Sequence, residues 1–208
     1  SYIAATTRAK VTLIEGHKMG GDCLNFGCVP SKALLRPAAF LQQARQAPGL
    51  GIARVTGDYN FGDVMARVHR IINTVEPHDS VERYTKLGVE VIHGNARITS
   101  PWTVEVNGQT VSTRAIVIAT GARPTIPRIP GLEQVRYLTF ETIWSLVERP
   151  EHLVVLGGGP VGCELAQAFA RLDCQVTQVV RTGLMGREDA DAVALVEAAL
   201  RADGVRVL

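Results

Sequence analysis

The chain has 208 residues, 46% of them hydrophobic, and its 22 basic and 20 acidic residues leave a formal net charge of +2. This length can bury the core of one large domain or of two medium ones. Scattered, balanced charges argue against a nucleic-acid partner, four cysteines are too few for a secreted disulfide scaffold, and no apolar run reaches the roughly 18 residues that span a bilayer. We therefore expect a cytoplasmic protein that binds neither nucleic acid nor membrane.

The first predicted strand is residues 11–15, Val-Thr-Leu-Ile-Glu, which are typical of a short buried strand that ends in an acid. In a dinucleotide-binding fold, an acid at the end of the second strand hydrogen-bonds a ribose hydroxyl. Glu15 is therefore a candidate ribose ligand, and the alternative is a strand-end glutamate in solvent.

Residues 20–32 contain Cys23 and Cys28, where a glycine-rich turn runs into an apolar, helix-like segment. Four intervening residues keep the sulfurs close enough to bridge, and the turn residues among them allow the ring to open and close. Cys28 lies beside the expected helix start, where unpaired N–H groups stabilise a thiolate, and Lys32 adds a positive charge one turn on. The pattern favours a redox dithiol. A structural disulfide or half of a zinc site is the alternative, although a zinc site needs a second Cys/His pair at ligand spacing, which the sequence lacks.

The run GGDCLNFGCVPSKALL, residues 20–35, resembles the active-site segment of the flavin-dependent pyridine nucleotide-disulfide oxidoreductases. This is the family of dihydrolipoamide dehydrogenase, glutathione reductase and mercuric reductase. The resemblance implies FAD as a cofactor, with Glu15 on its adenosine half and with Gly21 and Asp22 among its contacts. It also implies that Cys28 faces the flavin and that Cys23 attacks the external substrate.

Residues 1–5 resemble the helix that follows the first glycine-rich turn in this family, but that turn is missing and the helix is short before Val11. We therefore expect that the chain is a fragment, or that its numbering runs continuously across residues that are absent from it. The family's acid-base histidine belongs to a C-terminal dimerisation domain, and the chain stops before it. The resemblance implies a homodimer for the intact gene product, and poor nucleotide binding and little turnover for this chain alone.

A helix is predicted from Cys28 to about Ala47, and Pro37 should kink or interrupt it. A loop follows over residues 48–61, and a second helical stretch over residues 61–87 should bend near Pro77. The apolar stripes of both helices are typical of core or dimer packing.

Residues 89–92 are the next predicted strand. The resemblance implies that the segment after this strand lies against the adenine, with Ala96 in backbone contact. Polar and apolar residues alternate over 103–112 across an Asn-Gly pair, which predicts a hairpin.

The apolar run 115–119 is typical of a buried strand, and it ends in a turn that lets the backbone approach a cofactor closely. Many strands end in this way. The turn, Ala119-Thr120-Gly121, resembles the family's second flavin-contact motif. Residues 122–150 contain several prolines and predict a connection between domains, with a short helix at 140–147.

A buried strand at 153–156 is followed by Gly157-Gly158-Gly159-Pro160-Val161-Gly162 and a helix over 163–172. This is G-x-G-x-x-G in its strand-turn-helix context, which predicts that these residues and the helix N-terminus hold a pyrophosphate. Gly157 forms the turn, Gly159 admits the pyrophosphate and Gly162 lets the helix pack closely. Glu164 lies in the first helical turn. The resemblance implies a place for it near nicotinamide and flavin, and a favourable position near the helix dipole is the alternative.

The strand at 175–180 ends in Val180 and Arg181, where an NAD-preferring domain carries an acid. An acid repels a 2′-phosphate, which needs cations, and Arg181 and Arg187 flank a turn from which both could reach one phosphate. The resemblance also implies NADPH, because its NADPH-using members carry the same pair. Two solvated arginines are the alternative.

These elements, with a helix at 188–200 and a strand from 205, predict an α/β protein with two Rossmann-like dinucleotide-binding domains of three layers. We expect an FAD-binding domain over residues 1–120, a connection over 121–150 and an NADPH-binding domain over 151–208. Cys163 and Cys174 are predicted to be small core residues.

The resemblance implies hydride transfer from NADPH to FAD, then electron transfer to the Cys23–Cys28 disulfide and on to a small disulfide or Hg(II). Asp22 and the Arg-Glu-Asp run at 187–189 resemble mercuric reductases, whose C-terminal cysteine pair lies outside this chain. Two alternatives remain: an NAD-dependent dihydrolipoamide dehydrogenase, and a nucleotide-binding redox sensor or regulatory fragment without turnover.

Overall fold

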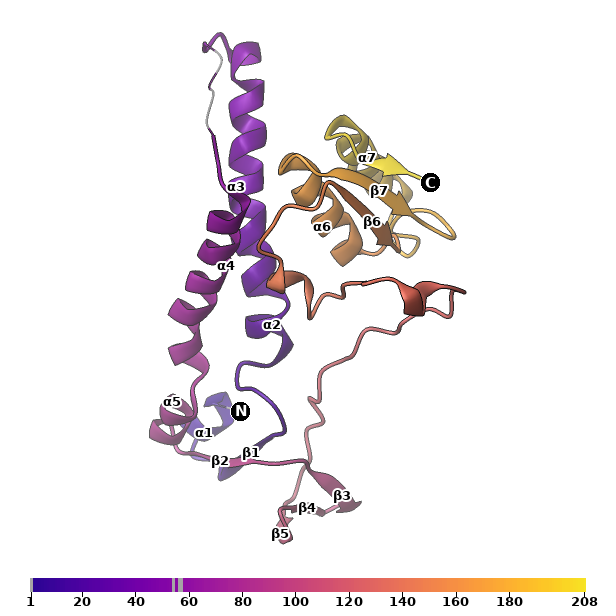
Figure 1. The fold of residues 1–208 in the computed structure, drawn as a ribbon. Helices are drawn as coiled ribbons and strands as arrows, with labels where there is room; N and C mark the ends of the chain where they lie inside the picture. The colour runs from indigo at the N-terminus through magenta and orange to yellow at the C-terminus, as the bar shows by residue number, and fades with distance from the viewer. Residues whose placement is uncertain (1, 54, 56–57) are drawn as a thin grey trace. The chain divides into compact units, whose positions relative to one another are not determined.

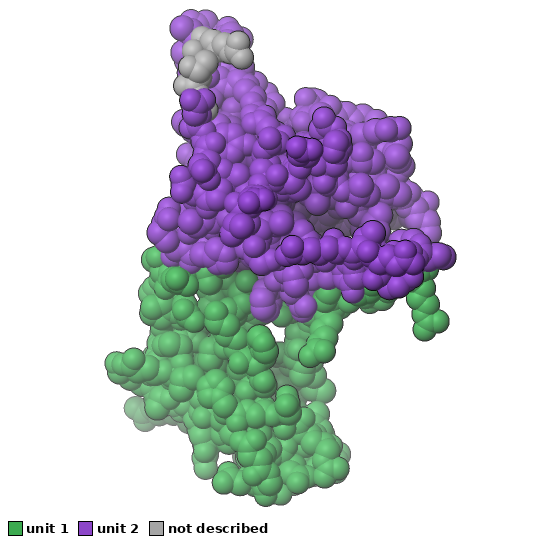
Figure 2. Space-filling model, in the orientation of Figure 1, with its two compact units in different colours: residues 1–25, 72–128 green, residues 26–71, 129–208 purple. Residues whose placement is uncertain are grey.

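The computed structural model describes residues 2–53, 55 and 58–208, which form two compact units (Figure 2). Unit 1 comprises Ser1–Asn25 and Ile72–Arg128, and unit 2 comprises Phe26–Ile71 and Ile129–Leu208. This division differs from the predicted domain boundaries, and which nucleotide each part binds stays a prediction. Within the described residues, no helix combines the length and the apolar character needed to cross a membrane.

Unit 1 is built from two small sheets and short helices (Figure 1). Its elements in chain order are α1 (Tyr2–Thr6), β1 (Val11–Glu15), α2 (Gly21–Asn25), the end of α4 (Phe61–Val75), the 3-10 helix η2 (Glu76–Asp79), α5 (Val81–Lys86), β2 (Val89–His93), β3 (Arg97–Ser100), β4 (Thr103–Val106) and β5 (Gln109–Ser112). The long helical stretch predicted from residue 61 divides near Pro77, as the proline predicts.

The strands β1 and β2 pair in parallel, with Val11 opposite Val89 and Glu15 opposite His93. Both predicted strands are therefore confirmed, and their carboxyl ends lie at one edge. The hairpin of β4 and β5 is confirmed as well. Its turn residues Asn107 and Gly108 have φ values of 50° and 75°, the positive values that a two-residue hairpin turn requires.

The strand predicted over residues 115–119 does not form, and this prediction was wrong. Val117 and Ile118 are 87% and 70% exposed. An apolar run becomes a buried strand only where a neighbouring strand takes its backbone hydrogen bonds and other elements cover its faces. In the described part of unit 1, the sheet of β1 and β2 has these two strands, and residues 115–119 pair with neither of them.

Unit 2 combines a parallel sheet with long helices (Figure 1). Its elements are α3 (Cys28–Gln46), η1 (Ala47–Leu50), the start of α4, η3 (Leu132–Gln134), η4 (Ile143–Ser145), β6 (His152–Leu156), α6 (Pro160–Arg171), β7 (Gln175–Val179), α7 (Ala190–Ala202) and β8 (Arg206–Val207). The short helix predicted at 140–147 is the single 3-10 turn η4.

The sheet of unit 2 has the strand order β6-β7-β8, all parallel, with α6 and α7 as the connecting helices. This alternation is that of one half of a dinucleotide-binding domain. Val176 and Gln178 on β7 are buried, whereas Val154 and Leu156 on β6 project from the other face and are 60% and 49% exposed. The core of unit 2 therefore lies on the side of Val176 and Gln178.

The helix α3 runs without interruption through Pro37. The sequence predicted a kink or an interruption at this proline, and the interruption does not occur. Pro37 has no N–H to donate to the carbonyl of Ala33, four residues earlier, and a buried carbonyl without a partner is costly. Arg67 of α4 supplies the missing donor, with its Nη1 2.7 Å from the Ala33 oxygen. The guanidinium thus supplies the hydrogen bond that the proline cannot donate.

Replacing Arg67 by Met is expected to lower the free energy of unfolding by about 1–2 kcal/mol, because the Ala33 carbonyl loses its donor. In a Pro37→Ala background the helix supplies its own N–H, so the same replacement should cost clearly less. Urea unfolding of the four proteins of this cycle measures the difference. Equal costs in both backgrounds would show that Arg67 acts through packing alone.

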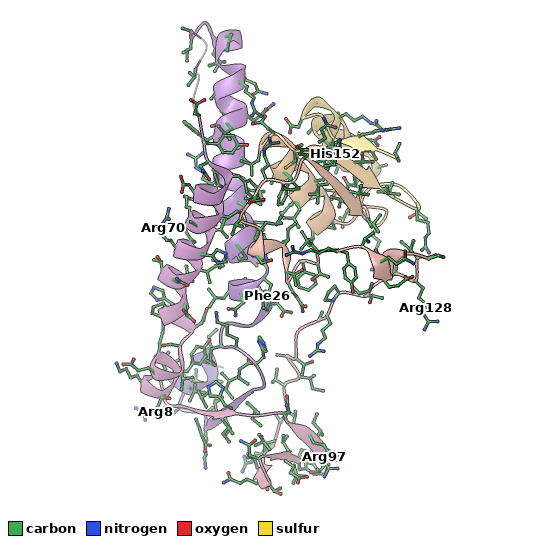
Figure 3. All side chains as sticks on the ribbon, viewed as in Figure 1. Arg8, Phe26, Arg70, Arg97, Arg128 and His152 are labelled. Carbon is green, nitrogen blue, oxygen red and sulfur yellow. The ribbon has the colours of Figure 1, made fainter. Side chains whose placement is uncertain are left out.

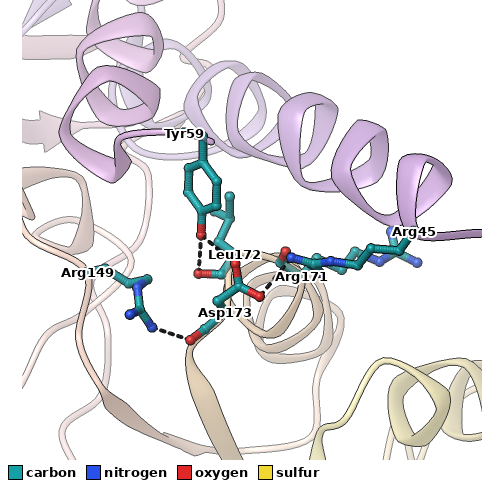
Figure 4. Close-up of polar contacts among 6 residues, drawn as sticks. All are labelled: Arg45, Tyr59, Arg149, Arg171, Leu172 and Asp173. Carbon is teal, nitrogen blue, oxygen red and sulfur yellow. Dashed lines mark hydrogen bonds and ion pairs between the residues drawn. The ribbon is translucent and has the colours of Figure 1, made fainter. Parts of the chain in front are cut away.

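The carboxyl end of α6 is capped by side chains from three other segments of unit 2 (Figure 4). Arg45 donates to the carbonyl of Arg171 at 2.8 Å, the Tyr59 hydroxyl donates to the carbonyl of Leu172 at 2.6 Å, and Arg149 donates to the carbonyl of Asp173. These are the carbonyls that a helix leaves without partners at its negative end, where cations are favourable.

Burial, with the nearby Asp173 carboxylate as a second cause, raises the pKa of Tyr59 from 10.0 to about 12. Because the folded value exceeds the unfolded one, the stability that Tyr59 contributes is fully present below pH 10 and is lost as the pH rises through about 12. We expect Tyr59→Phe to be less stable than the wild type at neutral pH, with the gap narrowing over this window. Urea unfolding at several alkaline pH values measures the gap, and Tyr137→Phe, which alters a 46% exposed ring, is the control replacement.

Candidate dithiol and dinucleotide site

The helix α3 begins at Cys28, as predicted, and its N-cap residue Gly27 makes no side-chain capping bond. The exposed Cys28 side chain therefore lies at the positive end of a 19-residue helix. Cys23 belongs to unit 1, where it lies in α2 and is also exposed. The predicted redox roles of the two cysteines stay predictions.

Lys32 and Glu164, two predicted site residues from distant parts of the sequence, form an ion pair in unit 2. The Lys32 Nζ lies 2.6 and 2.8 Å from the two carboxylate oxygens of Glu164. Lys32 lies one turn after the start of α3. Glu164 lies in the second turn of α6, because this helix begins at Pro160 and not at Cys163; our placement in the first turn was wrong.

The helices α3 and α6 run side by side in the same direction. The ion pair joins them near their N-terminal ends, and Arg45 joins them near their C-terminal ends through Arg171 and Asp173. Their contact places the helix start at Cys28 and the helix start after Gly159 at the same end of the pair. This juxtaposition was not predictable from either motif alone.

The glycine-rich turn has the geometry that a dinucleotide site requires. Gly157 has a φ of 117°, a value that favours glycine, and its N–H donates to the Val179 carbonyl at 2.9 Å. A Cβ at Gly162 would lie 2.7 Å from the Gly157 oxygen, so close packing of the helix requires glycine there. A Cβ at Gly159 would meet nothing within 4 Å, which leaves the space in front of the helix open. Pro160 and Val161, both exposed, form the first turn of α6 at this opening.

Arg181 and Arg187 are exposed and follow β7 at the same sheet edge as the glycine turn. The loop that carries them is tied to this turn, since Met185 N–H donates to the Gly158 carbonyl at 2.6 Å. The residues of the turn thus fit a dinucleotide: an open helix start for the pyrophosphate, with two cations on an attached loop.

In unit 1, the structure brings Asp22 and Gly121 together. Asp22 Oδ2 accepts from the Ala122 N–H at 3.1 Å, and a Cβ at Gly121, whose φ is 70°, would lie 2.7 Å from the same oxygen. Gly21 and the exposed Ala119 and Thr120 therefore lie in segments that meet. The carboxylate thus holds the two predicted flavin-contact segments against each other.

Glu15 ends β1 and Ala96 follows β2, at the carboxyl edge that the two paired strands share. The Glu15 carboxylate accepts from the His17 N–H at 2.7 Å, and the Glu15 carbonyl accepts from the Gly94 N–H at 3.0 Å. The carboxylate keeps further lone pairs for a ribose hydroxyl. Ala96 is exposed just after this turn.

Two side chains that hold the predicted motifs were missed. Gln178 is fully buried on β7, and its Nε2 donates to the Gly157 carbonyl at 2.9 Å. A polar residue at an inward position of a predicted strand was the available signal. Trp144 donates from its ring N–H to the carbonyl of Phe26, labelled in Figure 3, at 3.0 Å, and no local pattern indicates this contact.

Cys163 and Cys174 are buried, which confirms their predicted place in the core. Burial raises the pKa of the Cys163 thiol, and it raises the pKa of Cys174 to about 11. Both are therefore protonated at neutral pH. Across the parts that the structure describes, no group of three His, Cys, Asp or Glu side chains is arranged to hold a metal ion.

The fold is that of an α/β dinucleotide-binding protein, as predicted. A family model described as pyridine nucleotide-disulphide oxidoreductase matches residues 2–208. The chain belongs to this family, and the resemblance drawn from the cysteine segment is confirmed.

Curated relatives of the chain include mercuric reductases. The protein from Streptomyces lividans is 37% identical over 212 residues, a match that covers 99% of this chain and 45% of that protein. The protein from Lysinibacillus sphaericus is 33% identical over 201 residues, covering 96% of this chain and 37% of that protein. The chain thus spans less than half the length of these relatives.

Solved structures with the same fold include a flavoprotein disulfide reductase and LpdA. The HOCl-induced flavoprotein disulfide reductase RclA from Escherichia coli has a TM-score of 0.79 and 28% identity, and the match covers all of this chain and 45% of that one. LpdA from Mycobacterium tuberculosis has a TM-score of 0.78 and 28% identity, and covers 48% of that chain.

Proposed function

We propose that the protein to which this chain belongs passes electrons from NADPH through FAD to the Cys23–Cys28 pair, and from there to a small disulfide or to Hg(II). The bound nicotinamide and flavin supply the hydride and electron chemistry, and the chain supplies the positions. The observation that carries the proposal is the Lys32–Glu164 ion pair. It fixes the start of the dithiol helix α3 beside the start of the dinucleotide helix α6.

Each element of this arrangement has a definite task. The N–H groups at the start of α6 hold the negative pyrophosphate, which the open space at Gly159 admits. Cys28, at the start of α3, holds its sulfur as a thiolate toward the flavin, while Cys23 attacks the substrate. Lys32 and Glu164 orient each other, so that neither charge is left without a counterion near the reacting groups.

The nucleotide is NADPH because β7 is followed by cations. Val180 and Arg181 stand where an acid would bind the ribose 2′-hydroxyl of NAD, and Arg187 lies on the same loop. Both guanidinium groups are exposed and can pair with a 2′-phosphate.

The substrate class rests on the relatives. The mercuric reductases among them favour Hg(II), and the flavoprotein disulfide reductases favour a disulfide. Both are soft electrophiles that a thiolate attacks, so the dithiol itself serves either reaction. We also propose that the full-length protein is a cytoplasmic homodimer.

Anaerobic titration of the full-length protein with NADPH and NADH tests this proposal. NADPH should bleach the flavin and then produce a long-wavelength thiolate–flavin band, with NADH less effective. A protein that gives no such band with either nucleotide does not use the relay, which would leave the redox-sensor alternative. Preference for NADH would contradict the proposal that Arg181 and Arg187 select NADPH.

Replacing Arg181 and Arg187 by Gln separates nucleotide choice from the relay. The double variant should lose its preference for NADPH and should still give the band when dithionite replaces the nucleotide. Arg206, which is exposed on β8, is the control position for a change of charge elsewhere on the same sheet.

A further inference from the structure

Trp144 links the connecting segment of unit 2 to the loop between the two cysteines. Its side chain is 4% exposed, and its ring N–H donates to the carbonyl of Phe26 at 3.0 Å. Phe26 lies two residues before Cys28 and is labelled in Figure 3. A buried indole N–H needs a partner, so this bond is costly to lose.

The bond acts at the entry to α3. The peptide between Phe26 and Gly27 leads directly into α3, and Gly27 has φ −110° and ψ −112°, with no side-chain capping bond at this helix start. The Trp144 bond fixes the carbonyl side of that peptide. It therefore sets the direction from which the backbone enters the helix at Cys28.

Trp144 is itself held from α4. The Nε2 of His69 lies 2.9 Å from the Trp144 carbonyl, and it donates in the tautomer that carries the proton on this nitrogen. The indole is thus fixed through its ring N–H and through its main chain. Packing alone does not explain this arrangement, because a phenylalanine would fill most of the same space.

We propose that Trp144 is a positioning residue for Cys28. Its indole N–H keeps the Phe26–Gly27 peptide in the orientation that places the Cys28 sulfur among the N–H groups at the start of α3. This inference rests on the proposed redox role of the dithiol. Loss of the N–H frees this peptide, so the helix start supports a thiolate at Cys28 less well.

The test uses the full-length protein with Cys23→Ser, so that Cys28 is the reacting cysteine of the pair. Trp144→Phe, and benzothienylalanine at position 144 as an isostere without the N–H, both remove the donor. We expect iodoacetamide to alkylate Cys28 roughly threefold more slowly at pH 7 in both. Amide hydrogen exchange over residues 24–28 should become about tenfold faster. Trp102→Phe, at the 60% exposed tryptophan, is the control and should change neither.

The thiolate–flavin band of the reduced protein provides a readout that a loss of packing does not move. It should weaken in both Trp144 variants and not in Trp102→Phe. Wild-type alkylation and exchange rates in a folded benzothienylalanine protein would overturn the proposal. If the wild type itself shows no band, the proposed relay fails, while alkylation and exchange still decide the role of Trp144.

Discussion

Replacing Cys28 by Ser in the full-length protein is expected to reduce NADPH-dependent turnover of a small disulfide or Hg(II) on the order of 10³-fold or more. A serine hydroxyl forms no disulfide and is not ionised at neutral pH, so no step of the proposed dithiol chemistry can use it. The side chain is exposed at a helix start, and the replacement removes no core packing. Steady-state NADPH oxidation measures the loss, and flavin content and circular dichroism should stay as in the wild type.

The matched control for this loss is Cys163→Ala in the same chain. Cys163 is buried in α6, and burial raises the pKa of its thiol, so it takes no part in the proposed reaction. Turnover in this variant should stay within about threefold of the wild type, since the replacement is small. If Cys28→Ser retained a tenth of the wild-type rate, another nucleophile would have to carry the reaction.

Replacing Gly162 by Ala and replacing Gly159 by Ala are expected to have different effects on stability and on nucleotide binding. At Gly162 the new methyl group would lie 2.7 Å from the backbone oxygen of Gly157, so the helix or the turn must move. We expect Gly162→Ala to lose about 1–3 kcal/mol of unfolding free energy. It should also bind NADPH weakly, because the turn that holds the pyrophosphate is displaced.

At Gly159 a methyl group meets no protein atom within 4 Å. The stability of Gly159→Ala should stay within about 0.5 kcal/mol of the wild type. The methyl group would still occupy the space through which the pyrophosphate approaches, so we expect the Kd for NADPH to rise roughly 10²-fold, about 2.8 kcal/mol. Urea unfolding and nucleotide titration separate the two variants. Normal binding by Gly159→Ala would contradict the proposed pyrophosphate position.

The sequence allowed prediction of features that depend on neighbours along the chain. The strand, turn and helix around Gly157–Gly162, the helix start at Cys28 and the Asn107-Gly108 hairpin all follow from local turn chemistry and periodicity. The apolar run at 115–119 has equally good local character. It forms no strand, because a strand also needs hydrogen bonds to a neighbouring strand, which local patterns do not report.

The candidate site divides in the same way. Cys28, Gly159 and Arg181 could be proposed as site residues because each belongs to a motif with a physical purpose. Gln178 and Trp144 were missed, because each acts through a single hydrogen bond to a backbone carbonyl far away in the sequence. Such contacts exist only once the fold has brought the segments together. The hydrogen bond from Arg67 to the Ala33 carbonyl, which Pro37 leaves without a donor, is of the same kind.

The parallel course of α3 and α6 has an electrostatic consequence. Two helices aligned in one direction place like partial charges side by side at each end, which is unfavourable. At the carboxyl ends, Arg45 and Arg149 relieve this repulsion. At the amino ends, a nucleotide pyrophosphate or a thiolate would relieve it, and an anion that neutralises one end reduces the positive field that stabilises an anion at the other. Nucleotide binding and thiolate formation should therefore be thermodynamically linked with equal strength in both directions, and added salt should weaken that linkage.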